Sequence, residues 1–318
     1  FRQLIFYLKY FILIREWLKE SQNEIPEYLN EIIFFLGQNY NFIWQNTNQS
    51  LLFNGNHINS NIDFDKYLSF HNYKFKSEGN ENGGYAILKN KSIFISVDLG
   101  SSPQKKFSND YQSGALSFEI FYKNSKLITN CGYFQNYKHQ LNSISKSTAT
   151  HSTLVLDNRS SCKMKKASDG IFKVDEELKI IRKSIISEKN YWNINGSHDG
   201  YLKKYGLIHE RKIEFFTEKN KFIGTDKLIK KKNFKSSNFE IRFHFIPGVK
   251  ITKTQDGNSI LIELENSGWK FSCKNNKIDV ETGLYFGKKN SFIENQNIFI
   301  SGLTRNEDQE IMWELIKI

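Results

Sequence analysis

Histidine and arginine side chains are the first residues in this sequence that suggest chemistry on an anionic substrate. His209 and Arg211 alternate in the segment GLIHERKI, and alternate residues of a strand point to the same face. The imidazole could transfer a proton, and the guanidinium could hold a carboxylate through two parallel hydrogen bonds. We interpret the pair as candidate catalytic residues acting on a carboxylate-bearing substrate. An ion pair with Glu210 or Glu214 elsewhere in the sheet is the alternative.

Two polar loops contain candidate substrate-binding residues. His139 and Tyr137 lie in the run QNYKHQLN, where the mixture of aromatic and polar side chains is of the kind that stacks on sugar rings. Loops on rigid sheets often carry function. His198, in NINGSHDG before a strand, could line a groove. The alternative for His198 is an ordinary turn in which Asp199 caps its own backbone.

The elements that would position these side chains show the period of two that is typical of strands. From Gly84 onward, short apolar segments alternate with turns at regular spacing. Three hairpins are expected: Tyr85 to Leu88 with Ser92 to Val97, Ile208 to Phe216 with Phe222 to Ile229, and Val249 to Thr252 with Ile260 to Leu264. This pattern predicts a mainly β fold, a large antiparallel β-sandwich over residues 83–318.

The first part of the chain has a different period. Apolar residues recur at helical spacing over residues 1–50, and the short break before Pro26 predicts two antiparallel helices. Residues 51–82 are rich in Asn, Gly and Ser, which favours turns, so we predict a linker there. The charged residues within the first twenty positions argue against a membrane-spanning segment: Arg2, Lys9, Arg15 and Lys19. Because the chain begins with Phe, we expect that its natural N-terminus is missing and that any signal peptide is not observable.

Composition suggests an anionic partner but does not specify one. The 318 residues include 45 Lys and Arg against 34 Asp and Glu, a net charge of +11 that would attract an acidic polysaccharide or a nucleic acid. The basic residues are scattered along the chain, which favours a general compositional bias and places nucleic-acid binding last. The three cysteines lack C-x-x-C spacing and indicate neither a disulfide framework nor a cysteine zinc site.

Several separate segments between about Gly83 and Gly302 resemble a known family. The chain is similar to the C-terminal β-domain of the heparinase II/III-like polysaccharide lyases, in their alphaproteobacterial form. The segments that carry the resemblance are SGALSFEIF (113–121), KLITNCG (126–132), STATHSTLVLDN (147–158), HDGYLKKYGLIHERKI (198–213), FEIRFHFIPGV (239–249) and NSGWKFSC (266–273).

The resemblance implies a fold, an activity and a compartment. In these lyases, paired helices form an incomplete α/α toroid before the sandwich, so residues 1–50 would be its last helices. The activity is β-elimination on an acidic, uronate-containing glycan, and the compartment would be the periplasm or cell envelope. The toroid supplies an Asn or His and a Tyr, and the sandwich supplies a catalytic His. Most of the toroid has no counterpart in this chain.

The resemblance also assigns candidate residues, with changes from the family pattern. The family's His-x-His positions read Asp110-Tyr111-Gln112, its Asp position is Asn130, and its later His is His151. We therefore include Asp110 and His151 among the candidate catalytic residues. Because carboxamides are poor zinc ligands, we expect Gln112, Asn130 and His151 to form hydrogen bonds in place of the family's metal site, and we expect no cofactor.

One geometric prediction tests this assignment. The strands around Leu116, Leu127 and Leu154 should lie side by side and bring the former metal positions into one neighbourhood. The predicted function is that of a polysaccharide lyase-like protein acting on a uronate-containing glycan. The alternative is a noncatalytic glycan-binding or envelope protein that kept the sandwich and lost the catalytic His.

Overall fold

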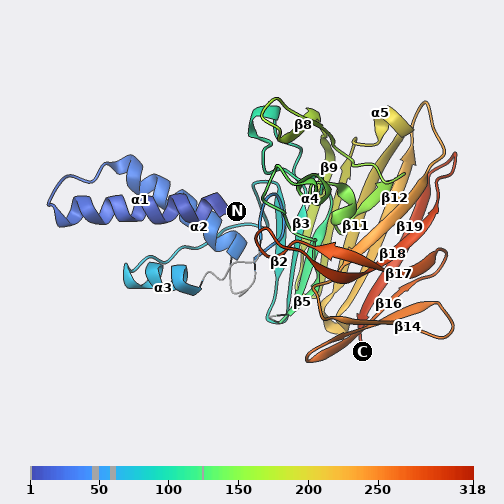
Figure 1. The fold of residues 1–318 in the computed structure, drawn as a ribbon. Helices are drawn as coiled ribbons and strands as arrows, with labels where there is room; N and C mark the ends of the chain where they lie inside the picture. The colour runs from blue at the N-terminus through green and yellow to red at the C-terminus, as the bar shows by residue number, and fades with distance from the viewer. Residues whose placement is uncertain (1, 45–49, 58–61, 124) are drawn as a thin grey trace.

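The chain folds into a helical arm attached to a stack of antiparallel sheets. The computed structural model describes residues 2–44, 50–57, 62–123 and 125–318. Figure 1 shows the arm, in blue, projecting from the sheets, which hold the C-terminus. The helices are α1 (Arg2–Glu20), α2 (Glu27–Trp44), α3 (Ile62–Phe70), α4 (Gln140–Ser145) and α5 (Leu202–Tyr205), and the 3-10 turns are η1 (Lys105–Phe107), η2 (Thr148–Thr150) and η3 (Thr217–Lys219).

Four antiparallel sheets contain all nineteen strands of the described ranges. The first has the order β1 (Glu81–Asn82), β2 (Tyr85–Lys89), β3 (Ile93–Asp98), β4 (Phe118–Tyr122), β5 (Ser125–Ile128). The second has the order β14 (Lys250–Lys253), β15 (Ser259–Leu264), β16 (Ser267–Cys273), β19 (Gln309–Lys317), β12 (Lys221–Lys230), β11 (Leu207–Phe216), β10 (Tyr191–His198), β9 (Ile180–Ser187). The third has the order β17 (Lys277–Tyr285), β18 (Ile293–Leu303), β13 (Asn238–His244), β6 (Leu154–Leu156), and the fourth pairs β7 (Lys163–Lys166) with β8 (Phe172–Glu176).

The predicted fold class is confirmed, and so are the three hairpins. β2 pairs with β3, β11 with β12 and β14 with β15, each in antiparallel register. β11 has strictly alternating burial along its ten residues, which is the pattern that the sequence indicated for a strand with one face in the core.

The helical arm is held together by one apolar seam. Leu8 and Ile12 of α1 and Leu29 and Ile33 of α2 are all buried. The same cluster includes Phe121 on the outer face of the five-stranded sheet, so the arm is docked on that face. This agrees with the two predicted helices, although residues 45–49 of the predicted segment lie outside the described residues.

The predicted linker, residues 51–82, is more ordered than expected where it is described. It contains α3, and Leu51 and Phe53 are at most 1% exposed. Phe64 and Leu68 of α3 are buried in the same cluster as the arm. Burial of these apolar side chains outweighs the local turn preference of the Asn- and Gly-rich composition. Residues 58–61 lie outside the described ranges, and the boundaries at 50 and 82 stay predictions.

The five-stranded sheet is buried on both faces, whereas the sequence pattern suggested one buried face. Phe118 and Ile120 of β4 point to the sandwich core, and Phe121 points to the helical arm. Glu119 is also fully buried and pairs with Lys126 at 3.1 Å. Its oxygens additionally accept hydrogen bonds from the backbone amides of Leu52 and Asn130. The arm and the segment after it therefore cover a face that would otherwise be open to water.

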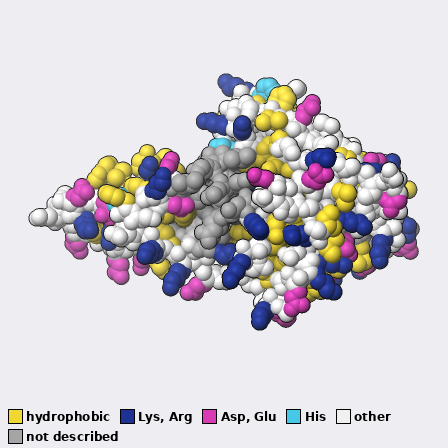
Figure 2. All heavy atoms as spheres, turned by 90° about the horizontal axis from the view of Figure 1, so that it is seen from below, with side chains coloured by type: hydrophobic (Ala, Val, Ile, Leu, Met, Phe, Trp, Pro, Cys, Tyr) yellow, Lys and Arg dark blue, Asp and Glu magenta, His cyan; other side chains and the backbone are white. Residues whose placement is uncertain are grey.

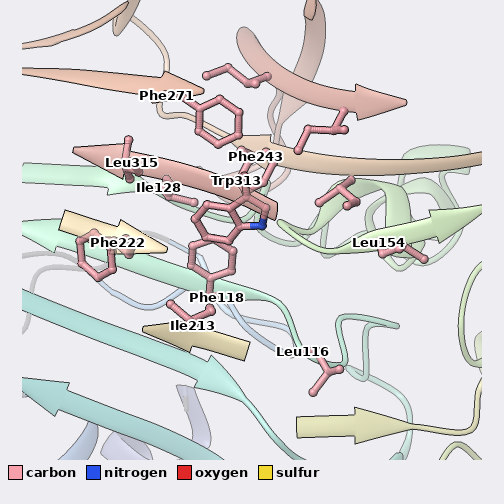
Figure 3. Packing of buried hydrophobic residues seen from close by; sticks show 14 of the residues in the cluster. Leu116, Phe118, Ile128, Leu154, Ile213, Phe222, Phe243, Phe271, Trp313 and Leu315 are labelled. Carbon is pink, nitrogen blue, oxygen red and sulfur yellow. The ribbon is translucent and has the colours of Figure 1, made fainter. Parts of the chain in front are cut away.

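The main core lies between the sheets and is rich in aromatic rings. Trp313 of β19 stacks on Phe118 with ring centroids 5.6 Å apart, and its other contacts include an edge-on Phe243 at 4.9 Å. Figure 3 shows these rings at the centre of residues contributed by several sheets. Burying a side chain of this size stabilises the fold by roughly 1.5–3 kcal/mol. The core therefore fixes how the sheets sit on one another.

The prediction that three strands lie side by side is correct for two of them. β4 and β5, near Leu116 and Leu127, are hydrogen-bonded neighbours. β6, which contains Leu154, belongs to the four-stranded sheet and pairs with β13. The chain crosses from one sheet to another between Thr129 and His151, and the sequence alone gave no signal for that change of sheet.

Candidate functional site

His209 and Arg211 lie on one face of β11, as predicted, but that face is the protein interior. The two residues are 0% and 2% exposed. The Arg211 guanidinium donates two parallel hydrogen bonds to Asp226, from Nε to Oδ1 at 2.8 Å and from Nη2 to Oδ2 at 3.0 Å. The carboxylate that the sequence led us to expect on a sugar, or on Glu210 or Glu214, is instead that of Asp226.

His198 continues this network, and the donors determine its protonation. The backbone amide of Gly200 donates to His198 Nδ1 at 3.1 Å, so the proton of the neutral ring lies on Nε2. His198 Nε2 then donates to His209 Nδ1 at 3.3 Å, and His209 Nε2 donates to Asp226 Oδ1 at 2.7 Å. Burial lowers the pKa of both histidines, which keeps the chain of hydrogen bonds neutral up to the carboxylate.

This buried network argues against direct contact with a polymer. His198, His209 and Arg211 are enclosed, and Trp313 Nε1 adds a second hydrogen bond to Asp226 Oδ2 at 3.0 Å. The geometry therefore supports a structural role for the three predicted residues. Asp226 was missed at the sequence level, although it stands on the apolar face of FIGTDKLI, directly opposite Arg211 in the strand register.

Gln112, Asn130 and His151 occupy one neighbourhood, as predicted, and all are at most 1% exposed. Gln112 Nε2 donates to the carbonyl of Gly132 at 3.0 Å, and Asn130 Oδ1 accepts from the amide of Ser152 at 2.9 Å. The three side chains are thus linked through the backbone of the segments on which they stand.

These residues do not fit the metal that the fold family implies. The Gln112 amide is fully engaged, because Oε1 accepts from the amide of Gly55 at 3.0 Å while Nε2 donates to two carbonyls. His151 Nδ1 donates to the carbonyl of Ser147 at 2.9 Å, which leaves one imidazole nitrogen as the sole good donor atom of the set. Burial lowers the pKa of His151 to about 4, so the ring is neutral at physiological pH.

His244 belongs to the same neighbourhood and was not predicted. Its Nδ1 lies 2.8 Å from Asn297 Oδ1 and 3.2 Å from the thiol of Cys131, and its Nε2 lies 3.1 Å from the carbonyl oxygen of Ala149. Burial lowers the pKa of His244 to about 3. A histidine next to the apolar residues of FHFIPG was the available signal, but a sequence pattern does not show which loop a strand end will meet.

The predicted loop residues lie at the surface. Tyr137 is 51% exposed, and His139 is exposed as well. His139 caps α4, because its Nδ1 accepts a hydrogen bond from the amide of Leu141 at 3.2 Å, and its ring lies 5.0 Å from that of Phe134. These positions leave the predicted substrate-binding role of Tyr137 and His139 open as a prediction.

Asp110 lies in a pocket of about 250 Å³ where the segment after α2 meets the first sheet and the loop after β3; we call it the junction pocket. Its lining also includes Asn54, Tyr85, Asp98 and Tyr111. Asn54 Nδ2 donates to the Tyr85 hydroxyl at 2.5 Å and lies 3.5 Å from Asp98 Oδ2. A carboxyl group, a phenol and an amide therefore meet at one place.

Burial shifts the pKa of Asp98, an acid in the junction pocket, toward neutral pH. It raises the pKa of Asp98 to about 7, opposed in part by the hydrogen bond from the amide of Gly100 and by the amide of Asn54. Burial likewise raises the pKa of Tyr85, which stays protonated. Gly84 lines the neighbouring turn at φ +85°, and a Cβ there would lie 2.8 Å from Gly100 Cα. The close approach of these two glycines fixes the backbone that holds Asp98.

Positive charge is dispersed over the surface, as the sequence suggested. Figure 2 shows Lys and Arg side chains spread among Asp and Glu over the face that it presents. Within the described residues, no helix has both the length and the apolar character needed to cross a membrane. In the same part of the chain, no group of three or more His, Cys, Asp or Glu residues is arranged to hold a metal ion.

Comparisons with known proteins agree with the observed β-sandwich fold. Residues 76–314 match the family described as Heparinase II/III-like, C-terminal. The chain is 26% identical over 210 residues to FtsZ-localized protein C of Caulobacter vibrioides (strain NA1000 / CB15N), a match covering 62% of this chain and 36% of that protein. Its fold is similar to that of heparan sulfate lyase HepC from Pedobacter heparinus, with a TM-score of 0.76 and 14% identity over 99% of this chain and 51% of that one. A heparinase III structure gives 0.70 and 14% over 98% and 53%.

The family match and the structural likenesses together define the fold as that of a Heparinase II/III-like C-terminal domain. The chain spans about a third of the length of the Caulobacter protein and about half of each lyase. Because the matched residues make up more than half of the chain, it belongs to the Heparinase II/III-like, C-terminal family. At 14% identity, the lyase structures establish the fold and leave substrate and activity to be argued from the site.

Proposed function

We propose that this chain is part of a protein that cleaves a uronate-containing polysaccharide by β-elimination, with its chemistry at the junction pocket. The observation that carries the proposal is the convergence of Asp98, Tyr85 and Asn54 there, with the pKa of Asp98 raised to about 7. A general base works best when its pKa is near the working pH, and a protonated phenol is a suitable acid. The family membership supports the same reaction class.

Each residue has a role that its chemistry permits. Asp98 would remove the proton from the carbon next to the uronate carboxyl group. The electron pair of that C–H bond forms the new carbon–carbon double bond, and the bond to the glycosidic oxygen breaks. Tyr85 would protonate the departing oxygen, while the amide of Asn54, which donates to the Tyr85 hydroxyl and to Asp98, would hold the acid and the base in position. The proposed reaction requires no metal or redox cofactor.

The test is the formation of unsaturated products, which absorb in the near ultraviolet. Full-length protein is incubated with a panel of uronate-containing polysaccharides, alongside Asp98→Asn and Tyr85→Phe. We expect each substitution to lower kcat by about 10²-fold or more, since each removes one proton transfer. Asp256→Asn, on the exposed turn between β14 and β15, is the matched control and should keep full activity. Equal rates for Asp98→Asn and the wild type would contradict the assignment.

A second candidate function is noncatalytic binding of an acidic glycan. Two observations favour it: His151 is buried, and the position of the family's catalytic His holds the carboxylate of Asp110 at the junction pocket, where it would repel a uronate. This candidate predicts glycan binding without any unsaturated product across the whole panel. We place the protein in the periplasm or cell envelope in either case, and fractionation of cells that make the tagged full-length protein tests that placement.

A further inference from the structure

A larger pocket lies away from the junction, between α4, β7, β8 and α5, and we call it the basic pocket. Its volume is about 630 Å³. Four separate segments of the chain form its wall: residues 143–147, 159–164, the strand β8 and residues 200–205. None of the residues predicted from the sequence as catalytic or substrate-binding lines it.

The wall of the basic pocket carries an excess of positive charge. Five cations line it, Lys146, Arg159, Lys163, Lys203 and Lys204, against the single carboxylate of Glu176. Glu176 is shared by Lys163 and Lys203, each at 2.6 Å. These exposed ion pairs contribute little to stability, so the cations can turn toward a ligand at little cost.

Lys146 provides a cation at the inner end of the basic pocket. The residue is 1% exposed, and its ammonium donates to the carbonyls of Asn109 at 2.5 Å and Phe172 at 2.7 Å. An ammonium group has three N–H donors, so these two bonds leave one for a further acceptor. Both acceptors are neutral carbonyls, and the carboxylates of Asp110 and Asp169 act on the ammonium only through space, so an anion that accepts the third N–H would add a direct partner.

Two lysines of the basic pocket have lowered pKa values, mainly because of desolvation. Burial lowers the pKa of Lys146 to about 8; the carboxylate of Asp110 opposes this shift, Lys173 adds to it, and Asp169 opposes it. Desolvation lowers the pKa of Lys204 too, followed by repulsion from Arg159 and Lys235. A bound anion would relieve this repulsion.

The rest of the wall suits a sugar. The rings of Phe172, Tyr201 and Tyr205 offer apolar faces, and the hydroxyl groups of Ser147, Ser160 and Ser161 line the same cavity. Pockets that bind small ligands combine such apolar walls with a few convergent polar groups. A hexose ring with one or two anionic substituents would match both features.

We propose that the basic pocket is a binding subsite for a sugar residue that carries carboxylate or sulfate groups. It lies apart from the junction pocket and would anchor a part of the chain that is not being cleaved. The choice of a sugar as the ligand rests on the proposed function, whereas the requirement for an anion rests on the wall of the pocket alone.

Isothermal titration of full-length protein at physiological salt tests the subsite. The probes are a sulfated uronate hexasaccharide, a neutral hexasaccharide and a single-stranded DNA hexamer. The test variant is Lys203→Ala with Lys204→Ala. The matched control is Lys231→Ala with Lys232→Ala, which removes the same charge from an exposed lysine run after β12. Thermal melting confirms that both variants fold.

We expect the sulfated hexasaccharide to bind, and the neutral one not to bind. The Lys203 and Lys204 substitutions should weaken the sulfated hexasaccharide about tenfold, because two charge-assisted contacts are lost, and the control should change affinity less than twofold. No binding, an equal loss in both variants, or equal affinity for the DNA hexamer would overturn the proposal.

The assay for unsaturated products separates this proposal from the proposed function. Loss of affinity in the Lys203 and Lys204 variant, with unchanged product formation from a disaccharide repeat too short to span both pockets, supports a separate subsite. Binding at the basic pocket by a protein that forms no product leaves the subsite standing and overturns the elimination.

Discussion

The network around Asp226 and the basic pocket around Lys146 use charge in opposite ways. Asp226 is fully buried, and Arg211, His209 and Trp313 together satisfy both of its oxygens. Lys146 is equally buried but donates to backbone carbonyls, beside an open wall with more cations than carboxylates. The first arrangement is complete without a ligand, whereas the second gains from an anion.

This difference shows which polar residues are available for function. A residue type that suits catalysis, such as the His209 and Arg211 pair, supports the fold when its partners are already within the protein. A better criterion for a functional candidate is a polar or charged group whose hydrogen-bond or charge partners within the protein are incomplete. By this criterion the junction pocket and the basic pocket are the stronger sites.

The largest effect is expected from breaking the Asp226 network. Asp226→Ala leaves the Arg211 guanidinium buried without a counter-charge, which should lower the free energy of unfolding by about 3–5 kcal/mol. Urea denaturation followed by tryptophan fluorescence measures the change. Glu24→Ala, which removes an exposed carboxylate between α1 and α2, is the control and should change it by less than about 0.5 kcal/mol. Similar losses in the two variants would show that the network does not stabilise the fold.

Acidification should destabilise the folded protein through its buried histidines. The folded protein keeps His151, His244, His198 and His209 neutral, whereas the unfolded chain protonates them below about pH 6.5. Stability is therefore complete above that pH and falls as the pH drops toward 4, by about 1.4 kcal/mol per pH unit for each histidine. Asp98, with its raised pKa, acts in the opposite direction and offsets one of these four protons.

Urea denaturation at a series of pH values between 4 and 7.5 measures this slope. His151→Gln should make it shallower, because one buried imidazole no longer takes up a proton on unfolding. His139→Gln changes a ring that is exposed in the folded protein and should leave the slope as it is. A stability that is flat from pH 7 to pH 4.5 would contradict the neutral buried histidines.

The sequence predicted the architecture well because the period of two in the strands is a local signal. The alternation in GLIHERKI placed His209 and Arg211 on one face of β11 correctly. It did not determine whether that face meets water or another sheet, and in the structure it meets the interior. The burial of Glu119 is not visible in the pattern for the same reason, since the helical arm and the segment after it cover the second face of its sheet.

The candidate sites are formed by contacts between segments that are distant in the sequence, and no local sequence pattern predicts such contacts. The family resemblance predicted that Gln112, Asn130 and His151 lie close together. It could not predict that their side chains bind backbone groups, several of them from remote segments. The basic pocket combines four segments between residues 143 and 205, none of which is a motif alone. Asp98 directly follows the predicted strand Ser92 to Val97 and was not singled out, because its burial depends on the packing of remote segments such as the one that contains Asn54.

The smallest effect on stability is expected at the basic pocket, and this contrast with Asp226 is the sharpest test of the comparison. Lys203 and Lys204 are exposed, and the Lys203 pair with Glu176 is a surface ion pair. Replacing both lysines with alanine should change the free energy of unfolding by less than about 0.5 kcal/mol per site in urea denaturation without ligand.

Added sulfated hexasaccharide should then raise the stability of the wild type, because a ligand that binds only the folded state stabilises it by mass action. The Lys203 and Lys204 variant should gain less at the same concentration, while Asp226→Ala should gain as much as the wild type once it is folded. If the lysine variant loses several kcal/mol without ligand, its cations serve the fold in the way that Arg211 does. The basic pocket would then not differ from the Asp226 network, because its charges would already be used to stabilise the fold.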